Sequence, residues 1–426
     1  MAKESRLSRE LGRALRGDAE LGGVIDEVSD EPVATAAEAE LVVQVLRKLP
    51  LAAPSSDSVV SSPVHDVVAW FQGVESEAAF GVLDRFGGPE LVRLFDRLFV
   101  HVESCQDDLM FLLKVLALYV PDGGLERLVT AARSPLLADA YLWSVVFEIS
   151  ARPDHPWGPE LARALSDPLP SGFLGVAFLD LSNTLAREAR IERHPWDSDR
   201  GVAELSRFTS SRVEEEFSYA RSALGAAPFL SPPAAERLLA LGREHPDMHV
   251  RIESAWASAH TGREQGFAEL QQACADPRYA AVAMHYLDEL DASHRIPLVS
   301  RTEDFRAMAE MCQWLAHPSE FGRVPDRIEQ VDSRELHWPP TNDVRRVWLF
   351  RYRYPGDEGA EPDEGLGMVG SVTFALFGET TADKTPEDAY ALHCAWELEM
   401  NQDPRAPEKR TVAAGRRILA EYNEGF

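Results

Sequence analysis

Apolar residues recur at helical spacing through most of the chain between Val64 and about His317. One face of an α-helix returns every three or four residues, so this pattern predicts helix after helix. The breaks are short and contain Pro, Gly or Asp, which are typical of turns. Helices joined by short loops pack as antiparallel hairpins, and hairpins in series bury their apolar faces by stacking. We therefore predict an α-solenoid over 64–320, with its clearest helices at 90–102, 107–120, 136–150, 172–192, 234–243 and 250–260.

The first 63 residues have a different pattern. Leu7, Leu11 and Leu15 recur every four residues in a charged context, and a second helix is expected over 36–49. Residues 50–63 are rich in Pro and Ser, which indicates a loop or linker. We expect 1–63 to form peripheral N-terminal helices followed by a linker.

After about Arg323, alternation of period two replaces the helical spacing. Residues 344–354 read VRRVWLFRYRY and residues 366–377 read LGMVGSVTFALF, and both are typical of strands. The acidic stretch 356–365 between them is expected to be a solvated hairpin loop. Residues 328–336 are a candidate third strand.

Two helices are predicted after these strands. Thr385 and Pro386 have the residue types of an N-cap and a first helical position, and the apolar stripe of this helix would be Ala389, Leu392, Trp396 and Met400. A last helix is expected over 407–422. Residues 321–426 are therefore predicted to be a small α+β domain, an antiparallel hairpin plus two helices. We expect the aromatic rings of 344–354 to pack beneath the two helices.

Three similar segments begin at Arg251, Arg278 and Arg306, at intervals of 27 and 28 residues. Segment 247–290 resembles the short HEAT-like repeats of phycobilisome-lyase-type proteins, on Asp247, Val250, Arg251, Ala255, Gly262, Leu270, Asp276 and Pro277. This match covers about one and a half repeats, and over 64–245 the likeness is architectural. The resemblance implies a mainly α, HEAT-like solenoid. The family contains scaffolds, adaptors and a few bilin lyases or isomerases, and no motif here selects one of these roles.

Charge narrows the classes of partner. The chain has 43 basic and 70 acidic residues, a formal net charge of −27 and a pI of about 4.8. Such a charge repels phosphate backbones and anionic membranes, so we expect neither nucleic acid nor membrane as a partner. The charged N-terminus lacks an apolar signal core and no window is apolar enough to span a bilayer, so a cytoplasmic location is expected.

Several motifs in the sequence do not select a function. Gly365, Gly367 and Gly370 match both the dinucleotide fingerprint and the kinase glycine loop, but neither context fits, and glycines that relieve crowding in a strand are expected. The single cysteines show no Cys-x-x-Cys spacing. Four histidines precede proline and share no period, which favours turn chemistry over a metal site: His155, His194, His245 and His317. We expect no catalytic residue, no metal ligand and no cofactor.

Two groups remain as candidate binding residues. Arg345, Arg346, Arg351 and Arg353 form the only dense basic cluster that we identify, which could pair with the acidic loop or grip an acidic ligand. His393 and Glu397 are four apart on a predicted helix, so they share a face. With Glu379 and Asp383 they could form an acid–base or metal group, or they could be structural.

The function that we predict is a non-enzymatic interaction scaffold or adaptor, which binds another protein through the solenoid surface. The alternative is an enzyme or small-ligand-binding module with its site where the solenoid meets the C-terminal domain. That alternative predicts a deep pocket lined by residues such as His393, Glu397 and Arg351. Whether the chain is an enzyme stays open at this point.

Overall fold

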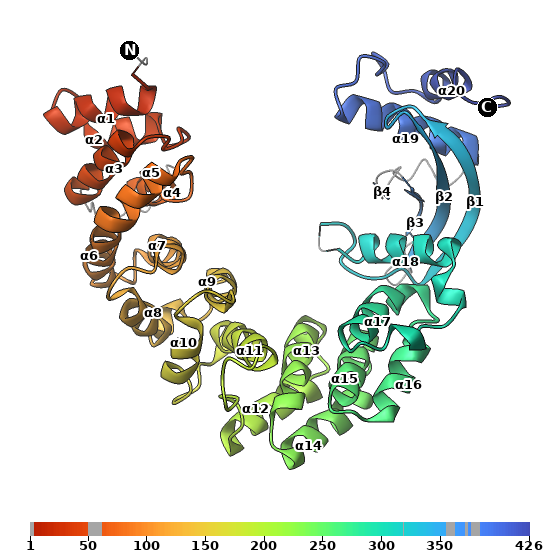
Figure 1. The fold of residues 1–426 in the computed structure, drawn as a ribbon, viewed down its shortest axis with the longest axis horizontal. Coiled ribbons are helices and arrows are strands. Elements are labelled where there is room, and N and C mark those ends of the chain that lie inside the picture. The colour runs from red at the N-terminus through yellow and green to blue at the C-terminus, as the bar shows by residue number, and fades with distance from the viewer. Residues whose placement is uncertain (1–3, 50–61, 318, 355–362, 371–373, 376–383) are drawn as a thin grey trace. The chain divides into compact units, whose positions relative to one another are not determined.

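A computed structural model of the chain describes residues 4–49, 62–317, 319–354, 363–370, 374–375 and 384–426. These residues are mainly helical, and an antiparallel sheet and two further helices follow the repeats (Figure 1). The predicted fold class, mainly α with a small α+β part, is therefore confirmed. The chain divides into two compact units, Met1–Gly242 and Arg243–Phe426, so the predicted boundary near residue 320 falls inside the second unit.

The first unit is built from helices joined by short turns. Its elements are α1 (Arg6–Arg16), α2 (Leu21–Glu27), α3 (Ala36–Lys48), α4 (Pro63–Ala69), α5 (Glu77–Val82), the π-turn η1 (Leu83–Gly87), α6 (Gly88–Phe99), α7 (Gln106–Tyr119), α8 (Gly124–Ala132), η2 (Pro135–Leu137), α9 (Leu142–Ala151), α10 (Gly158–Ala164), α11 (Gly172–Arg187), α12 (Asp199–Ser210), η3 (Glu214–Glu216), α13 (Phe217–Ala226), η4 (Ala227–Phe229) and α14 (Pro232–Arg243).

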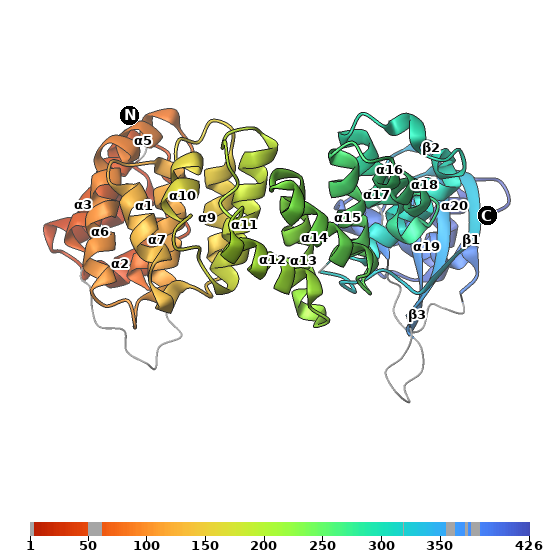
Figure 2. The same ribbon diagram turned by 90° about the horizontal axis from the view of Figure 1, so that it is seen from below.

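From α6 to α13, the helices of the first unit alternate between two rows. Helices α7, α9, α11 and α13 contact one another in order and form one row, while α6, α8, α10 and α12 follow the other (Figure 1). Figure 2 shows the same helices stacked along the unit. The predicted stacking of hairpins is therefore present, and it includes α8, α10 and α12, which the clearest apolar segments did not mark.

Three helices of the second row begin with the same short motif, Gly-x-Glu. Gly88, Gly124 and Gly158 begin α6, α8 and α10, each with a glutamate two residues later. A side chain on Gly124 would lie 2.6 Å from the ring of Trp157, which precedes α10. The glycine is needed because the neighbouring repeat packs directly on the start of the helix. This signal lies at intervals of 36 and 34 residues, in the part of the chain where we expected only an architectural likeness.

The N-terminal helices belong to the core of the first unit. Helix α3 contacts α5 and α6, and its Val42 and Val45 are fully buried. Thr35 and Glu38 form a capping box at the start of α3, which fixes where the helix begins. The expectation of peripheral helices was wrong, because their apolar faces pack against the first repeats. The predicted linker lies almost wholly outside the described residues.

The second unit continues with helices before its sheet. These are α15 (Met248–His260), α16 (Glu264–Ala273), α17 (Pro277–Glu289), the short turns η5 (Ser293–Arg295) and η6 (Val299–Arg301), and α18 (Glu303–Leu315). Arg251, Arg278 and Arg306 lie near the starts of α15, α17 and α18, so the interval that they mark is a structural one. Only the first interval contains a complete second helix, because η5 and η6 replace it in the next.

The sheet has the order β1-β2-β3-β4, and each neighbouring pair is antiparallel. Its strands are β1 (Arg327–Trp338), β2 (Asp343–Tyr354), β3 (Asp363–Val369) and β4 (Phe374–Ala375). The predicted continuous strand over 366–377 is wrong, because the chain turns back after Val369. Gly370 has φ of 129°, and a side chain there would lie 2.4 Å from the Arg346 carbonyl oxygen, so glycine is required at the turn.

The two faces of the sheet pack against different helices. Val347 and Leu349 share a core with α19 (Pro386–Met400) and α20 (Val412–Ala420). Phe350, Tyr352 and Tyr354 pack on the other face, against Met311 and Leu315 of α18. The expectation that the aromatic rings lie beneath the two last helices was wrong. The last repeat helix covers them instead, so the sheet is a middle layer of the second unit.

Helix α19 begins as predicted. Thr385 accepts a hydrogen bond from the backbone N–H of Asp388, and Pro386 occupies the first helical position. The predicted apolar stripe was wrong, because Met400 is 63% exposed while Tyr390, His393 and Leu398 are buried. The last helix, α20, is shorter than predicted and begins after its N-cap, Thr411.

Candidate functional site

The arginines of β2 do not converge on one site. Arg345 donates to both carboxylate oxygens of Asp343, at 2.9 and 2.7 Å, and to the carbonyl oxygen of Gly370 at 3.1 Å. These hydrogen bonds lower the pKa of Asp343 to about 2. Arg346 points to the opposite face, where its Nη2 lies 3.3 Å from Asp304 of α18. Alternation along the strand therefore separates two neighbouring cations.

The other two arginines lie further along the same strand. Arg351 lies 3.8 Å from Glu364, a residue of the predicted acidic loop that the structure places at the start of β3. Arg353 is exposed at the end of β2, opposite Glu364 across the ladder. One of the two predicted roles, pairing with the acidic stretch, is therefore present for Arg351. The residues of 355–362 lie outside the described part of the chain.

His393 and Glu397 are sealed inside the second unit. His393 is 0% exposed and Glu397 is 3% exposed, between α19 and the sheet. The indole Nε1 of Trp338 donates to Oε2 of Glu397 at 2.8 Å, and Nε2 of His393 lies 3.7 Å from the same oxygen. Burial lowers the pKa of His393 to about 3, because desolvation disfavours the imidazolium. This geometry agrees with the structural interpretation of the pair. The other two acids of the predicted group, Glu379 and Asp383, lie outside the described residues.

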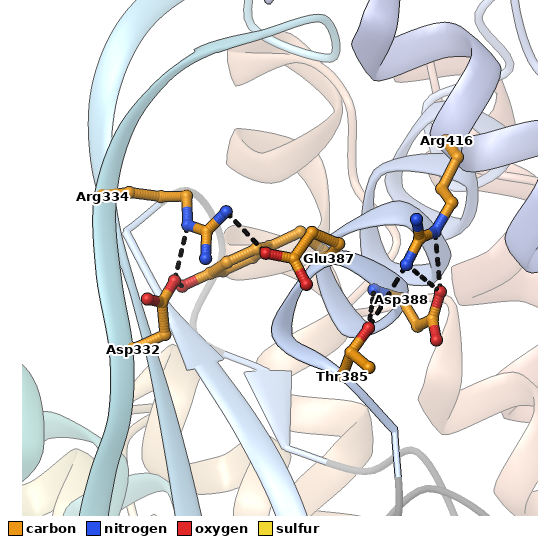
Figure 3. Close-up of polar contacts among 7 residues, drawn as sticks. Asp332, Arg334, Thr385, Glu387, Asp388 and Arg416 are labelled. Atoms are coloured by element: carbon orange, nitrogen blue, oxygen red, sulfur yellow. Dashed lines mark hydrogen bonds and ion pairs between the residues drawn. The ribbon is translucent and has the colours of Figure 1, made fainter. Parts of the chain in front are cut away.

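A network of polar contacts fixes the start of α19 (Figure 3). Arg334 of β1 donates to Asp332 at 2.6 Å and lies 3.0 Å from Glu387. The hydroxyl of the buried Tyr390 donates to the same Asp332 at 3.0 Å. Burial raises the pKa of Tyr390, and the charge of Asp332 adds to this effect.

The same network reaches the last helix. Arg416 of α20 donates to Asp388 at 2.7 Å and to the hydroxyl of Thr385 at 3.3 Å, as Figure 3 shows. Each guanidinium thus meets a carboxylate from a neighbouring element. The network connects α19 to β1 and to α20, and its charged groups are paired with one another in these contacts.

The four His-Pro sites share one kind of turn. In each, Nδ1 of the histidine accepts the backbone N–H of the residue two positions later, at 3.1–3.3 Å: Trp157, Trp196, Asp247 and Ser319. The far nitrogen of His155 lies 2.7 Å from the Ala117 carbonyl oxygen. The predicted turn chemistry is therefore confirmed. Among the described residues, no group of His, Cys, Asp and Glu is placed to hold a metal ion.

A groove of about 840 Å³ lies in the first unit, between α10 and the start of α12. Its apolar lining residues are Pro159, Ala162, Leu169, Ile191 and Pro195. Four arginines and three carboxylates also line it: Arg163, Arg190, Arg193, Arg200, Asp167, Glu192 and Asp197. This size is in the range of ligand-binding clefts.

The four arginines of the groove differ in how they are engaged. Arg190 donates to the carbonyl oxygen of His155 at 3.1 Å and pairs with Glu188 at 3.1 Å. Arg193 hydrogen-bonds to the carbonyl oxygen of Asp197. Arg163 and Arg200 are exposed, and their guanidinium groups make no hydrogen bond or ion pair with any residue that the structure describes. Two cations at the groove are therefore available to a ligand.

Sequence reasoning missed this groove. Its arginines come from α10, the α11–α12 connection and α12, which meet only after the hairpins stack. A partial signal did exist, because Arg190 and Arg193 lie three residues apart in one connection.

A second cavity, of about 420 Å³, lies in the second unit beside α15 and α16. Arg243, Arg251, Glu269 and Asp276 line it, so its charges balance. Nε of Arg243 already lies 3.9 Å from Glu269, and Asp276 is held by Arg278 at 2.6 Å. This cavity gives less reason to expect a ligand than the groove does.

Among the described residues, no helix has both the length and the apolar content that crossing a membrane requires. Comparison with protein-family models, with curated proteins and with solved structures found no match for this chain.

Proposed function

We propose that this chain is a non-enzymatic protein-binding scaffold or adaptor, and that a partner protein docks in the groove between α10 and α12. One observation carries the proposal. The groove is lined by apolar residues and by two exposed arginines, Arg163 and Arg200, whose guanidinium groups no described residue engages. Interfaces combine an apolar contact area with a few charged groups that fix orientation, and arginine is favoured among those groups.

The stacked hairpins support a scaffold in a second way. Each repeat contacts its neighbours in the row, so the surface along the rows is long and is built from many short loops. Inter-repeat contacts hold this surface in place. Arg133 of the α8–α9 connection donates to the carbonyl oxygen of Ala164 at 2.8 Å, at the end of α10. This contact holds the end of α10, beside the groove, against the preceding repeat.

The enzyme alternative receives less support from the geometry. His393 and Glu397 are buried between α19 and the sheet, whereas the last repeat helix, α18, lies on the opposite face of that sheet. The two candidate acid–base residues are thus remote from the repeat helix that would form the expected junction. The hydrogen bond from Trp338 accounts for the buried carboxylate of Glu397 without a substrate.

Affinity capture with matched variants tests the proposal. The tagged full chain is compared with Arg163→Glu/Arg200→Glu and with Arg212→Glu/Arg237→Glu, in which two exposed arginines outside the groove carry the same change of charge. We expect the full chain and the control variant to recover one partner in stoichiometric amount. We expect the groove variant to lose it while its circular dichroism is unchanged. Equal recovery by both variants would contradict docking in the groove.

A further inference from the structure

Basic residues make up a larger share of the charged residues that line the groove than of those in the whole chain. The chain has 43 basic and 70 acidic residues, whereas the groove is lined by four arginines and three carboxylates. One of these carboxylates, Asp197, accepts the backbone N–H of Ser231 at 3.0 Å, and Arg193 lies 3.9 Å from it. Arg190 is paired with Glu188 in turn, which leaves the exposed guanidinium groups of Arg163 and Arg200 beside the exposed carboxylates of Asp167 and Glu192. The groove is therefore mixed in charge, and its two exposed guanidinium groups are the ones that can bind anionic groups.

From this we infer that the segment held in the groove is an acidic, extended segment of a partner protein, whose carboxylates pair with Arg163 and Arg200. The inference rests on the proposed docking function and names the chemistry of its partner. A guanidinium presents a planar fork of donors that matches a carboxylate, so each arginine can form two parallel hydrogen bonds. The apolar lining residues Ala162, Leu169 and Ile191 provide contacts for aliphatic side chains between the acids.

A protein segment fits the groove better than a nucleic acid. Asp167 and Glu192 are exposed at its walls, so a continuous row of phosphates would meet like charges. A peptide can alternate acidic and other residues, and its backbone N–H groups can donate to these two carboxylates. The net charge of −27 adds a general repulsion, which grows with the charge of the ligand.

Selection from a phage-displayed library of random twelve-residue peptides tests the inference with the full chain as bait. We expect the selected peptides to be enriched in Asp and Glu, interspersed with aliphatic residues. In fluorescence polarisation with labelled selected peptides, Arg163→Glu/Arg200→Glu should weaken binding by about tenfold or more, because two charge-assisted contacts are reversed. The matched Arg212→Glu/Arg237→Glu variant should bind within about twofold of the full chain, since it leaves the groove intact.

The remaining outcomes separate the two proposals. Selected peptides without acidic enrichment, whose binding still depends on the groove arginines, would overturn the acidic segment and leave the scaffold standing. If acidic peptides bound equally to both variants, the groove would not be the place where the acidic segment binds. A poly-dT oligonucleotide that displaces the peptides would overturn the preference for a protein segment. Failure to select any peptide, together with failure to capture a partner, would overturn both proposals.

Discussion

The indole of Trp338 donates to the carboxylate of Glu397 at 2.8 Å, and both side chains are buried. Trp338→Phe keeps an aromatic ring but removes this donor. A buried acceptor that loses its donor costs about 1–3 kcal/mol, so we expect the free energy of unfolding to fall by that amount. Urea unfolding followed by circular dichroism measures the change.

A matched substitution separates burial from the loss of an indole. Trp348 donates to Asp304 at 2.8 Å, but the Asp304 side chain is 50% exposed, so water can replace the indole. Trp348→Phe should therefore cost less than Trp338→Phe. Equal costs would show that burial of Glu397 is not the deciding factor.

Buried histidines predict a dependence of stability on pH. Burial lowers the pKa of His194 to about 4 and that of His393 to about 3, from an ordinary value of 6.5. At a pH between the lowered pKa of each histidine and 6.5, the unfolded chain binds more protons than the folded chain. The free energy of unfolding therefore falls as the pH falls below 6.5. Each histidine contributes a slope of up to about 1.4 kcal/mol per pH unit in this range.

Urea unfolding measured from pH 7.5 to pH 4.5 tests this dependence. The contribution of the two histidines should be constant above pH 6.5 and should decline below it. In His393→Gln one titrating group is removed, so the decline should be shallower even where the variant is less stable at neutral pH. An unchanged slope in this variant would contradict a buried, neutral imidazole at position 393.

The His-Pro turns predict an unequal effect of two substitutions. Nδ1 of His155 accepts the Trp157 N–H at 3.2 Å. Asparagine can accept the same backbone N–H two residues on, whereas alanine cannot. We expect His155→Ala to lower the free energy of unfolding by about 1 kcal/mol more than His155→Asn, as measured by urea unfolding. If both substitutions lowered the free energy of unfolding equally, His155 would not contribute to stability as the hydrogen-bond acceptor of the turn.

Helices α19 and α20 cross at a glycine. A side chain on Gly415 would lie 1.9 Å from the carbonyl oxygen of Ala391, which belongs to the facing helix and cannot rotate away. Gly415→Ala should therefore destabilise the chain by about 1–3 kcal/mol through overpacking, despite the better helix propensity of alanine. Thermal unfolding measures the change.

Gly81 in α5 provides the control for this substitution. Nothing lies within 4 Å of the position that its side chain would occupy. Gly81→Ala should stabilise by about 0.5–1 kcal/mol, because only the backbone preference changes. If both substitutions changed stability in the same direction, the close crossing at Gly415 would be refuted.

Local patterns predicted much of the fold. The helical spacing of apolar residues predicted α7 and α11, with ends within a few residues of those observed, because these helices bury wide apolar faces. The period-two alternation predicted β2, because successive side chains of a strand point to opposite faces of the sheet. Helix α10 was missed because it has seven residues and begins with Gly-Pro, which reads as a turn in isolation.

Features that depend on contacts distant in sequence were not predictable in this way. Alternation divides Val347 and Phe350 between two faces, but it cannot say that α18 covers one of them. The candidate site shows the same limit. Arg345 and Arg346 are adjacent in sequence yet are held on opposite faces, whereas Arg163 and Arg200 meet at one groove across two repeats.

The most direct measurement of the central claim is site-specific photocrosslinking from the groove. A photoreactive amino acid is placed at Ser166, which lines the groove, and in a second protein at Glu148, which lies on α9 outside it. We expect the captured partner to crosslink from position 166, through a segment rich in Asp and Glu, and not from position 148. Crosslinking from position 148 alone would contradict the account.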